Sequence, residues 1–222
     1  MGRPDVIVFD VNETLLDLRA LRPGFESAMG SADAMGEWFA RMLHGSLVAN
    51  HVGAYRPFGE IGTDALVALA DKRGVELSRE SAAEVVAGMR TLPPHPDVIP
   101  ALERLRDGGF RLVTLTNGSA DAVASQLANS GVAPHIELAM SVDAVQRFKP
   151  APDVYLTAAA QLGVDVDAML MVAAHDWDIV GARSVGIPGA YIDRPSVRWA
   201  MPDRLPDLVG ADLGDIADQL LG

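Results

Sequence analysis

The stretch VIVFDVNETLLD, Val6 to Asp17, decides the fold of this chain. Its first four residues, Val6 to Phe9, are all apolar, and Asp10 follows them directly. An unbroken apolar run is typical of a buried strand in a parallel sheet that helices cover on both faces. A polar residue that follows such a strand lies at the carboxyl edge of the sheet, where open α/β folds bind their ligands. We therefore predict a buried first strand with Asp10 at a functional site.

Strands and helices alternate in the second part of the chain. The apolar segments that indicate strands are RLVTLTN (111–117), IELAMSV (136–142), MLMVAA (169–174) and GAYI (189–192). Between them lie helical segments, one with Ser119 as a suitable N-cap and Gly131 at its end, and one with Pro152 in its first turn. This alternation predicts an α/β fold with a doubly wound, Rossmann-like parallel sheet.

Residues 18–92 have a helical pattern without a strand segment. The apolar residues of one expected helix recur at helical spacing: Met35, Trp38, Phe39, Met42 and Leu43. The proline-rich stretch TLPPHPDV (91–98) then breaks the pattern. We predict a helical cap domain of residues 18–92, inserted after the first strand into a core domain of residues 1–17 and 93–222.

Composition excludes several classes of protein. The 222 residues include 18 Lys and Arg against 30 Asp and Glu, and a net charge of −12 argues against a nucleic-acid surface or an anionic membrane partner. Cysteine is absent, so disulfides and thiolate metal sites are excluded. No apolar run approaches the ~20 residues of a membrane span. The start of the chain lacks a signal-peptide pattern, because Asp5 and Asp10 bracket its apolar run. A cytoplasmic protein is expected.

Four short segments of this chain resemble the four motifs of the haloacid dehalogenase superfamily. They are FDVNETL (9–15), TLTN (114–117), KPAPDVY (149–155) and VAAHDWD (172–178), and their order and strand context make the resemblance specific. It covers nearly the whole chain, including the helical cap. It implies that Asp10 is a nucleophile, which suits a carboxylate that is partly desolvated and aimed at carbon.

Two missing acids indicate the branch of the superfamily. Its phosphatases carry a second Asp two residues after the nucleophile, where this chain has Asn12, and an acidic pair near the fourth motif, where Ala174 leaves only Asp178. An amide cannot protonate a leaving alcohol, and Mg²⁺ prefers carboxylates. The chain thus looks closest to the type II L-2-haloacid dehalogenases. These use no metal or other cofactor and convert a short (S)-2-haloacid to the (R)-2-hydroxy acid and halide through an aspartyl ester.

The resemblance assigns further catalytic roles. Thr14 would orient the carboxylate of Asp10, and Lys149 would keep it ionised, since a nearby ammonium lowers a carboxylate pKa. Asp178 would orient Lys149 or position the hydrolytic water. His175 is the other candidate for activating that water, because a neutral imidazole is a competent base near pH 7. Each residue also has a structural alternative, such as a turn cap or a solvated loop lysine.

A second group of residues is predicted to bind the substrate carboxylate and the halide. The resemblance points to Arg41 and Phe58 of the cap, and position at strand ends points to the core residues. The core members are Val11, Asn12, Thr116 and Asn117. Backbone N–H groups at the first two can form an anion nest. Arg41 as an ordinary surface arginine and Thr116 as part of a turn are the structural alternatives.

Two other functions remain open from the sequence. A Mg²⁺-dependent phosphatase of the same superfamily would lose activity with EDTA, and a non-catalytic small-molecule-binding member would never be labelled at Asp10. The expected partner is a small anionic haloacid, and a homodimer is kept as a possible assembly. The sequence does not select among the halogens, because one atom of difference is worth only ~1–3 kcal/mol.

Overall fold

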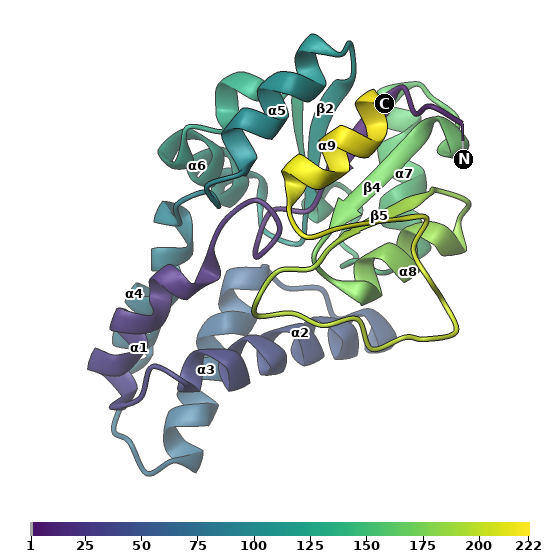
Figure 1. Ribbon diagram of the computed structural model, residues 1–222. Coiled ribbons are helices and arrows are strands. Elements are labelled where there is room, and N and C mark those ends of the chain that lie inside the picture. The colour runs from purple at the N-terminus through teal and green to yellow at the C-terminus, as the bar shows by residue number, and fades with distance from the viewer. Residues whose placement is uncertain (1) are drawn as a thin grey trace.

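The computed structural model describes residues 2–222 and has a central sheet of parallel strands (Figure 1). The strand order is β3-β2-β1-β4-β5-β6. The strands are β1 (Val6–Phe9), β2 (Arg111–Thr116), β3 (Leu138–Ser141), β4 (Met169–Ala173), β5 (Gly189–Ile192) and β6 (Leu208–Gly210). Strands β2 and β3 lie on one side of β1, and β4, β5 and β6 lie on the other, so the strand order changes direction at β1. The carboxyl ends of β1, β2 and β4 therefore lie together at one edge of the sheet.

Strand β1 lies in the middle of the sheet. Val8 pairs with Val113 of β2 on one side and with Met171 of β4 on the other. All four residues of β1 have an exposed fraction of 0%. Burial on both faces explains why the run Val6 to Phe9 is apolar without alternation. The predicted doubly wound fold is confirmed.

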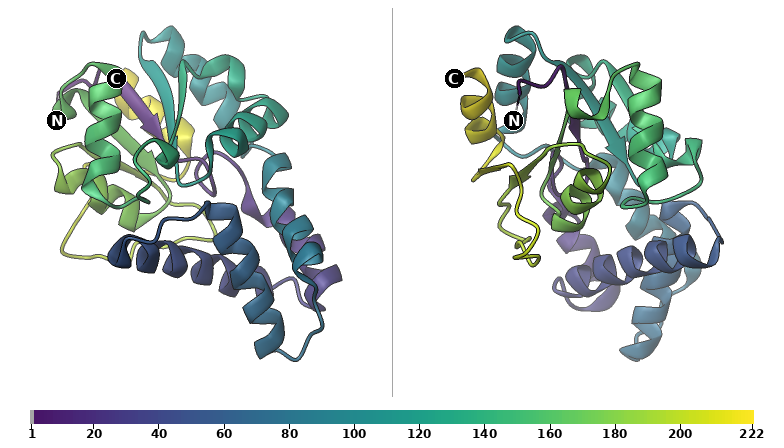
Figure 2. Two further views of the ribbon diagram at one scale, coloured as in Figure 1. Left: turned by 180° about the vertical axis from the view of Figure 1, so that it is seen from behind. Right: turned by 90° about the vertical axis from the view of Figure 1, so that its right-hand side faces the viewer.

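Two helical layers cover the sheet. The core helices are α5 (Val98–Asp107), α6 (Ala120–Ser130), α7 (Pro152–Leu162), α8 (Asp176–Ser184) and α9 (Leu213–Leu221). Helices α5 and α9 contact each other on one face, and α7 and α8 contact each other on the opposite face (Figures 1 and 2). The predicted caps are confirmed at α6: Ser119 accepts from the N–H of Ala122, and Gly131 has a φ of 76°.

Four helices between β1 and α5 form a separate layer over the carboxyl edge of the sheet (Figure 2). They are α1 (Arg22–Met29), α2 (Ala34–Val52), α3 (Phe58–Lys72) and α4 (Arg79–Ala87). Helices α2 and α3 pack together, and the buried indole of Trp38 donates to the carbonyl of Gly62 at 2.8 Å. This is the helical insert expected after the first strand, although the domain boundaries near residues 17 and 93 stay a prediction.

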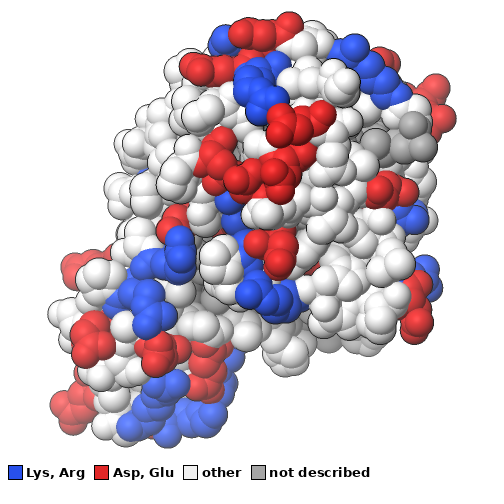
Figure 3. Space-filling model, in the orientation of Figure 1, with Lys and Arg blue, Asp and Glu red and all other residues white. Residues whose placement is uncertain are grey.

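Some elements differ from the sequence-based expectation. Strand β6 and helix α9 were not anticipated, because β6 has three residues and lies at the sheet edge, where Val209 is 56% exposed. Within the segment predicted to be helical, α4 ends at Ala87 and the chain continues as a 3-10 turn, Gly88–Thr91. Within residues 2–222, no helix combines the length and the apolar character that crossing a membrane requires. On the face seen in Figure 3, basic and acidic side chains are interspersed.

Candidate active site

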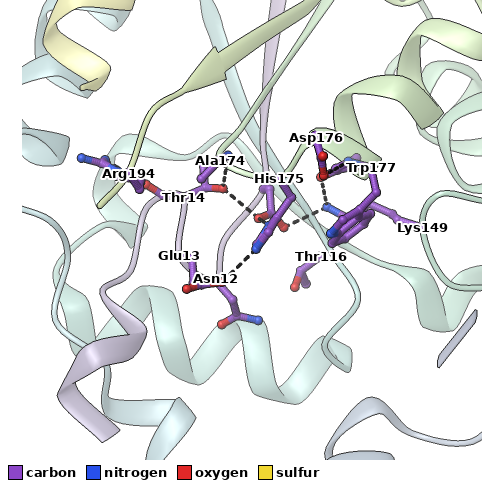
Figure 4. Close-up of polar contacts among 12 residues, drawn as sticks. Asn12, Glu13, Thr14, Thr116, Lys149, Ala174, His175, Asp176, Trp177 and Arg194 are labelled. Carbon is purple, nitrogen blue, oxygen red and sulfur yellow. Dashed lines mark hydrogen bonds and ion pairs between the residues drawn. The ribbon is translucent and has the colours of Figure 1, made fainter. Parts of the chain in front are cut away.

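Asp10 is held at the end of β1 by contacts that lead to the end of the neighbouring strand β4. Its backbone N–H donates to the carbonyl of Val172 at 3.0 Å, and its side chain is 7% exposed. The hydroxyl of Thr14 donates to Asp10 Oδ2 at 2.8 Å and accepts from the N–H of Ala174 at 2.9 Å (Figure 4). Because Thr14 is itself anchored to the end of β4, it fixes the angle of the Asp10 carboxylate.

Lys149 is a fully buried cation beside Asp10. Its Nζ lies 2.9 Å from Asp10 Oδ1 and 2.6 Å from Asp178 Oδ2, and it donates to the carbonyl of Leu115 at 2.8 Å. Burial favours the neutral acid, but the charge of Lys149 and the hydrogen bond to His175 outweigh it and hold the pKa of Asp10 well below its usual range. The same pairing overcomes burial of the ammonium and raises the pKa of Lys149. Asp10 is therefore an ionised carboxylate.

Asp178 is fully buried, and both of its carboxylate oxygens are engaged. Oδ2 pairs with Lys149, and Oδ1 accepts a hydrogen bond of 2.6 Å from the hydroxyl of Tyr155. Tyr155 closes the KPAPDVY motif, but the sequence analysis assigned it no role. Its hydroxyl holds Asp178 in place.

His175 lies between two acids. Its Nδ1 is 3.3 Å from Asp10 Oδ2, and its Nε2 is 2.9 Å from Glu13 Oε2 (Figure 4). Burial alone would lower the pKa of His175, but hydrogen bonds to Asp10 and Glu13 and their negative charge raise it to about 9. Glu13 was missed by sequence reasoning. The sequence feature that could have identified Glu13 is an acidic residue inside the first motif, FDVNETL.

A small pocket borders the Asp10 carboxylate. The residues that line it are Asp10, Asn12, Phe39, Leu43, Phe58, Asn117, His175 and Trp177. The structure thus brings together five of the predicted site residues, one of them from the cap. Asn117 Oδ1 accepts from the N–H of Lys149 at 2.8 Å, whereas its buried Nδ2 has no hydrogen-bond partner within residues 2–222. An unpartnered buried N–H costs free energy and suits an anion bound in the pocket.

The other predicted core residues have different surroundings. Val11 is fully buried directly after Asp10. Thr116 is also fully buried, and its hydroxyl accepts from the N–H of Gly118 at 3.1 Å. Neither side chain lines the pocket, so their roles in substrate binding stay predictions.

Asn12 has a fixed amide. Its Oδ1 accepts a hydrogen bond of 2.9 Å from Gln126 Nε2, which also donates to the carbonyl of Met89 at 3.0 Å. Asn12 and Phe58 also line a larger groove between α3, α4 and α6. The position that carries an acid in phosphatases is therefore a neutral wall between the pocket and this groove.

The structure does not bring Arg41 to the pocket. Its Nε and Nη2 donate to Glu37 Oε1 at 3.2 and 2.9 Å, one helical turn earlier on α2. Lys72 and Arg73 bind the same carboxylate, and these three cations lower the pKa of Glu37 to about 2. From α2 it is Phe39 and Leu43 that line the pocket.

No three His, Asp or Glu side chains of residues 2–222 are arranged to hold a metal ion. The ammonium of Lys149 pairs with both Asp10 and Asp178 and so occupies the space between these two acids. The donor set therefore fits a charge-paired nucleophile better than it fits a Mg²⁺ site.

Comparisons with known proteins show which proteins this chain resembles. The chain is 28% identical to (S)-2-haloacid dehalogenase H-109 of Pseudomonas putida over 97% of both proteins, and 28% identical to haloacetate dehalogenase H-2 of Moraxella sp. (strain B) over 93% of both. The structure of L-2-haloacid dehalogenase from Xanthobacter autotrophicus matches with a TM-score of 0.93 and 26% identity, covering 99% of each chain. The same enzyme with chloropropionic acid covalently bound matches with a TM-score of 0.93 at 25% identity over 99% of each chain.

The model of the haloacid dehalogenase-like hydrolase family matches residues 4–186, which include β1, the helical insert and the site around Asp10. That span is well over half of the chain, and the chain belongs to the haloacid dehalogenase-like hydrolases.

Proposed function

We propose that this protein is a hydrolytic dehalogenase that converts a short (S)-2-haloacid to the (R)-2-hydroxy acid and halide. The observation that carries the proposal is the surroundings of Asp10. Its carboxylate is kept ionised by Lys149 and borders a pocket with the apolar walls Phe39, Leu43 and Phe58. The position two residues on is an amide bound to Gln126, not an acid. A halide is a leaving group that needs no proton.

In the first step, Asp10 attacks carbon 2 of the haloacid from the side opposite the halogen. The carbon–halogen bond breaks as the ester bond forms, and the configuration at carbon 2 inverts. A partly desolvated carboxylate with a fixed angle makes such an in-line attack effective. The free N–H of Asn117 Nδ2 can donate to the departing halide or to the substrate carboxylate.

In the second step, water attacks the Asp10 carbonyl carbon of the ester. The 2-hydroxy acid leaves, and the Asp10 carboxylate is restored. The positive charge of Lys149 stabilises the carboxylate both before and after the cycle. The substrate carboxylate would meet the backbone N–H groups after Asp10 and the hydroxyl of Thr116.

A homodimer also stays a prediction.

The first test is stereospecific halide release. We expect the purified protein to release chloride from (S)-2-chloropropionate and form (R)-lactate, because in-line attack inverts carbon 2. Turnover of the (R) substrate should be low, because the fixed walls of the pocket present only one enantiomer to Asp10 in line. Ion chromatography and chiral chromatography measure the two products. Hydrolysis of p-nitrophenyl phosphate without any halide release would instead support the phosphatase alternative.

Activity should also survive removal of divalent metal. The reason is that Lys149, and not a cation site, neutralises Asp10 and Asp178. Halide release is measured before and after dialysis against EDTA, with less than about a two-fold change expected, well under the 1.4 kcal/mol that a ten-fold change represents. A loss that added Mg²⁺ restores would contradict the metal-free mechanism.

Substitution of Arg41 tests a role that the sequence predicts and the geometry does not support. Because the guanidinium is bound to Glu37 outside the pocket, we expect Arg41→Lys to lower kcat/KM less than about three-fold, the range of a surface ion pair. A loss of ten-fold or more, about 1.4 kcal/mol of transition-state stabilisation, would show that Arg41 leaves Glu37 when substrate binds. Arg22→Lys, on an exposed ion pair of α1, is the matched control.

A further inference from the structure

We propose that His175, positioned by Glu13, is the base that activates the hydrolytic water. This inference rests on the proposed function, since it concerns the hydrolysis of the Asp10 ester. It assigns Glu13 a positioning role in the reaction. It also separates the duties of the two candidates for water activation, His175 and Asp178.

Asp178 has no free oxygen to serve as that base. One oxygen pairs with Lys149 at 2.6 Å, and the other accepts from Tyr155 at 2.6 Å. The residue is fully buried and does not line the pocket beside Asp10. A base must reach the proton that it takes, directly or through one water. Asp178 therefore acts on Lys149.

His175 does border the pocket, and its ring is fixed from several sides. It stacks on Trp177 with ring centroids 5.1 Å apart, and Phe39 lies 6.0 Å away. In the neutral ring that keeps Nε2–H on Glu13, the lone pair of Nδ1 points toward the Asp10 side chain, 3.3 Å away, which carries the ester during the hydrolytic step. Water that attacks the ester carbonyl of Asp10 would lie within reach of this nitrogen.

Glu13 is itself built into place. It is 8% exposed, and its other carboxylate oxygen accepts from the hydroxyl of Ser196 at 3.0 Å. Its φ is 62°, in the left-handed region that residues with a Cβ rarely adopt. Backbone strain of this kind persists where the surroundings hold it, often at functional sites. The strained turn aims the carboxylate of Glu13 at His175.

The charges that face His175 explain how it can switch roles. They are Asp10 and Glu13, which contact the ring, and Lys149, which lies over the neighbouring ring of Trp177. In the free enzyme the two acids hold His175 protonated, with its pKa raised to about 9. Esterification removes the charge of Asp10, so the pKa of His175 falls and it releases its proton to solvent.

The proton balance then closes over the cycle. Neutral His175 takes a proton from water as the water oxygen bonds to the Asp10 carbonyl carbon. The bond between that carbon and the substrate oxygen breaks, and the leaving oxygen receives the second proton of the water. Asp10 is again a carboxylate and His175 is again protonated. The net products are hydroxy acid, halide and the one proton released earlier.

The test separates ester formation from ester hydrolysis in His175→Gln and Glu13→Gln. Each variant is mixed in excess with (S)-2-chloropropionate and quenched, and chloride and intact protein mass are measured over time. We expect a burst of one chloride per molecule of substrate, as in the wild type. The ester should persist at least about 100-fold longer than the wild-type ester, the usual scale of base catalysis. Controls are His51→Gln and Glu103→Gln, the same changes at exposed positions.

The outcomes distinguish this inference from the proposed function. Normal ester hydrolysis in both variants, or loss of the chloride burst in a folded variant, would overturn the role of His175 and Glu13. If the wild type itself forms no ester and releases no chloride, the proposed function fails. Circular dichroism checks folding, and His175→Asn replaces His175→Gln if the latter is unfolded.

A pH profile gives a readout that a purely structural role would not move. Ester hydrolysis should rise with pH as His175 loses its proton. In Glu13→Gln the imidazolium loses an anionic partner, so its pKa falls and the midpoint of this rise moves about one unit toward acid pH. A midpoint that stays at the wild-type pH contradicts the proposal.

Discussion

Asp10→Asn should abolish halide release, with a loss of at least about 10⁴-fold in kcat. A neutral amide is a poor nucleophile toward saturated carbon, and the pairing with Lys149 shows that the wild-type group is an ionised carboxylate. The measurement is initial chloride release from (S)-2-chloropropionate. Asp5→Asn, four residues before β1 ends and exposed, is the matched control and should keep wild-type activity.

Loss of activity alone does not show that Asp10 bonds to carbon, because a general base would behave similarly. A single turnover in H₂¹⁸O with enzyme in excess separates the two. If Asp10 attacks carbon, the product carries an unlabelled oxygen from Asp10, and the heavy oxygen appears in the peptide VIVFDVNETLLDLR. Heavy oxygen in the 2-hydroxyl group, with an unchanged peptide mass, would rule out the covalent mechanism.

The parts of the fold that depend on local sequence were predictable. The apolar run before Asp10 requires burial on both faces, and only a central strand such as β1 provides it. Ser119 and Gly131 bound α6 through backbone preferences that need no partner. Edge strand β6 was not predictable in this way, since it buries too little apolar surface to leave a pattern.

The candidate site likewise has residues that the sequence predicted and contacts that it did not. Asp10, Lys149 and Asp178 each follow a recognisable segment, and the structure joins them in one buried ion-pair cluster. The contact from Glu13 to His175 joins positions 13 and 175, and it depends on a left-handed turn that the residue types do not reveal. A sequence pattern fixes which face of a helix a residue occupies, but not which partner it binds.

Arg41 illustrates that last limit. Its position beside an apolar stripe was compatible with a cleft or with an ion pair on the helix. Glu37 lies four residues earlier on the same helix, the spacing at which side chains meet. Lys72 and Arg73 from α3 then complete a cation cluster on that acid, and these contacts depend on how α2 and α3 pack.

Lys149→Met should be nearly as damaging as loss of the nucleophile, and it should also destabilise the fold. The substitution keeps most of the length of the side chain but leaves Asp10 and Asp178 buried without their shared cation. Removal of one partner from a buried ion pair costs ~3–5 kcal/mol of unfolding free energy. Without the ammonium, burial raises the pKa of Asp10, and the neutral acid is a poor nucleophile, so we expect kcat at pH 7 to fall by at least about 10³-fold.

The free energy of unfolding of Lys149→Met should depend on pH in the opposite direction to that of the wild type. In the wild type the pKa of Asp10 is lowered on folding, so its contribution to stability is present above the unfolded pKa and is lost as the pH falls. In Lys149→Met we expect burial without the ammonium to bring the folded pKa of Asp10 above the unfolded value. Stability should therefore increase as the pH falls from neutral toward the unfolded pKa, the reverse of the wild type. Denaturant melts at several pH values measure this.

The chain offers a matched control, since Lys72 is its other lysine. Lys72 is 61% exposed and pairs with Glu37 on the cap, so Lys72→Met should change stability by less than about 1 kcal/mol and leave halide release intact. Activity of Lys149→Met should recover in part at high pH, where Asp10 ionises again. A variant with wild-type halide release at neutral pH would mean that Asp10 stays ionised without Lys149, and that this buried ammonium does not activate the nucleophile.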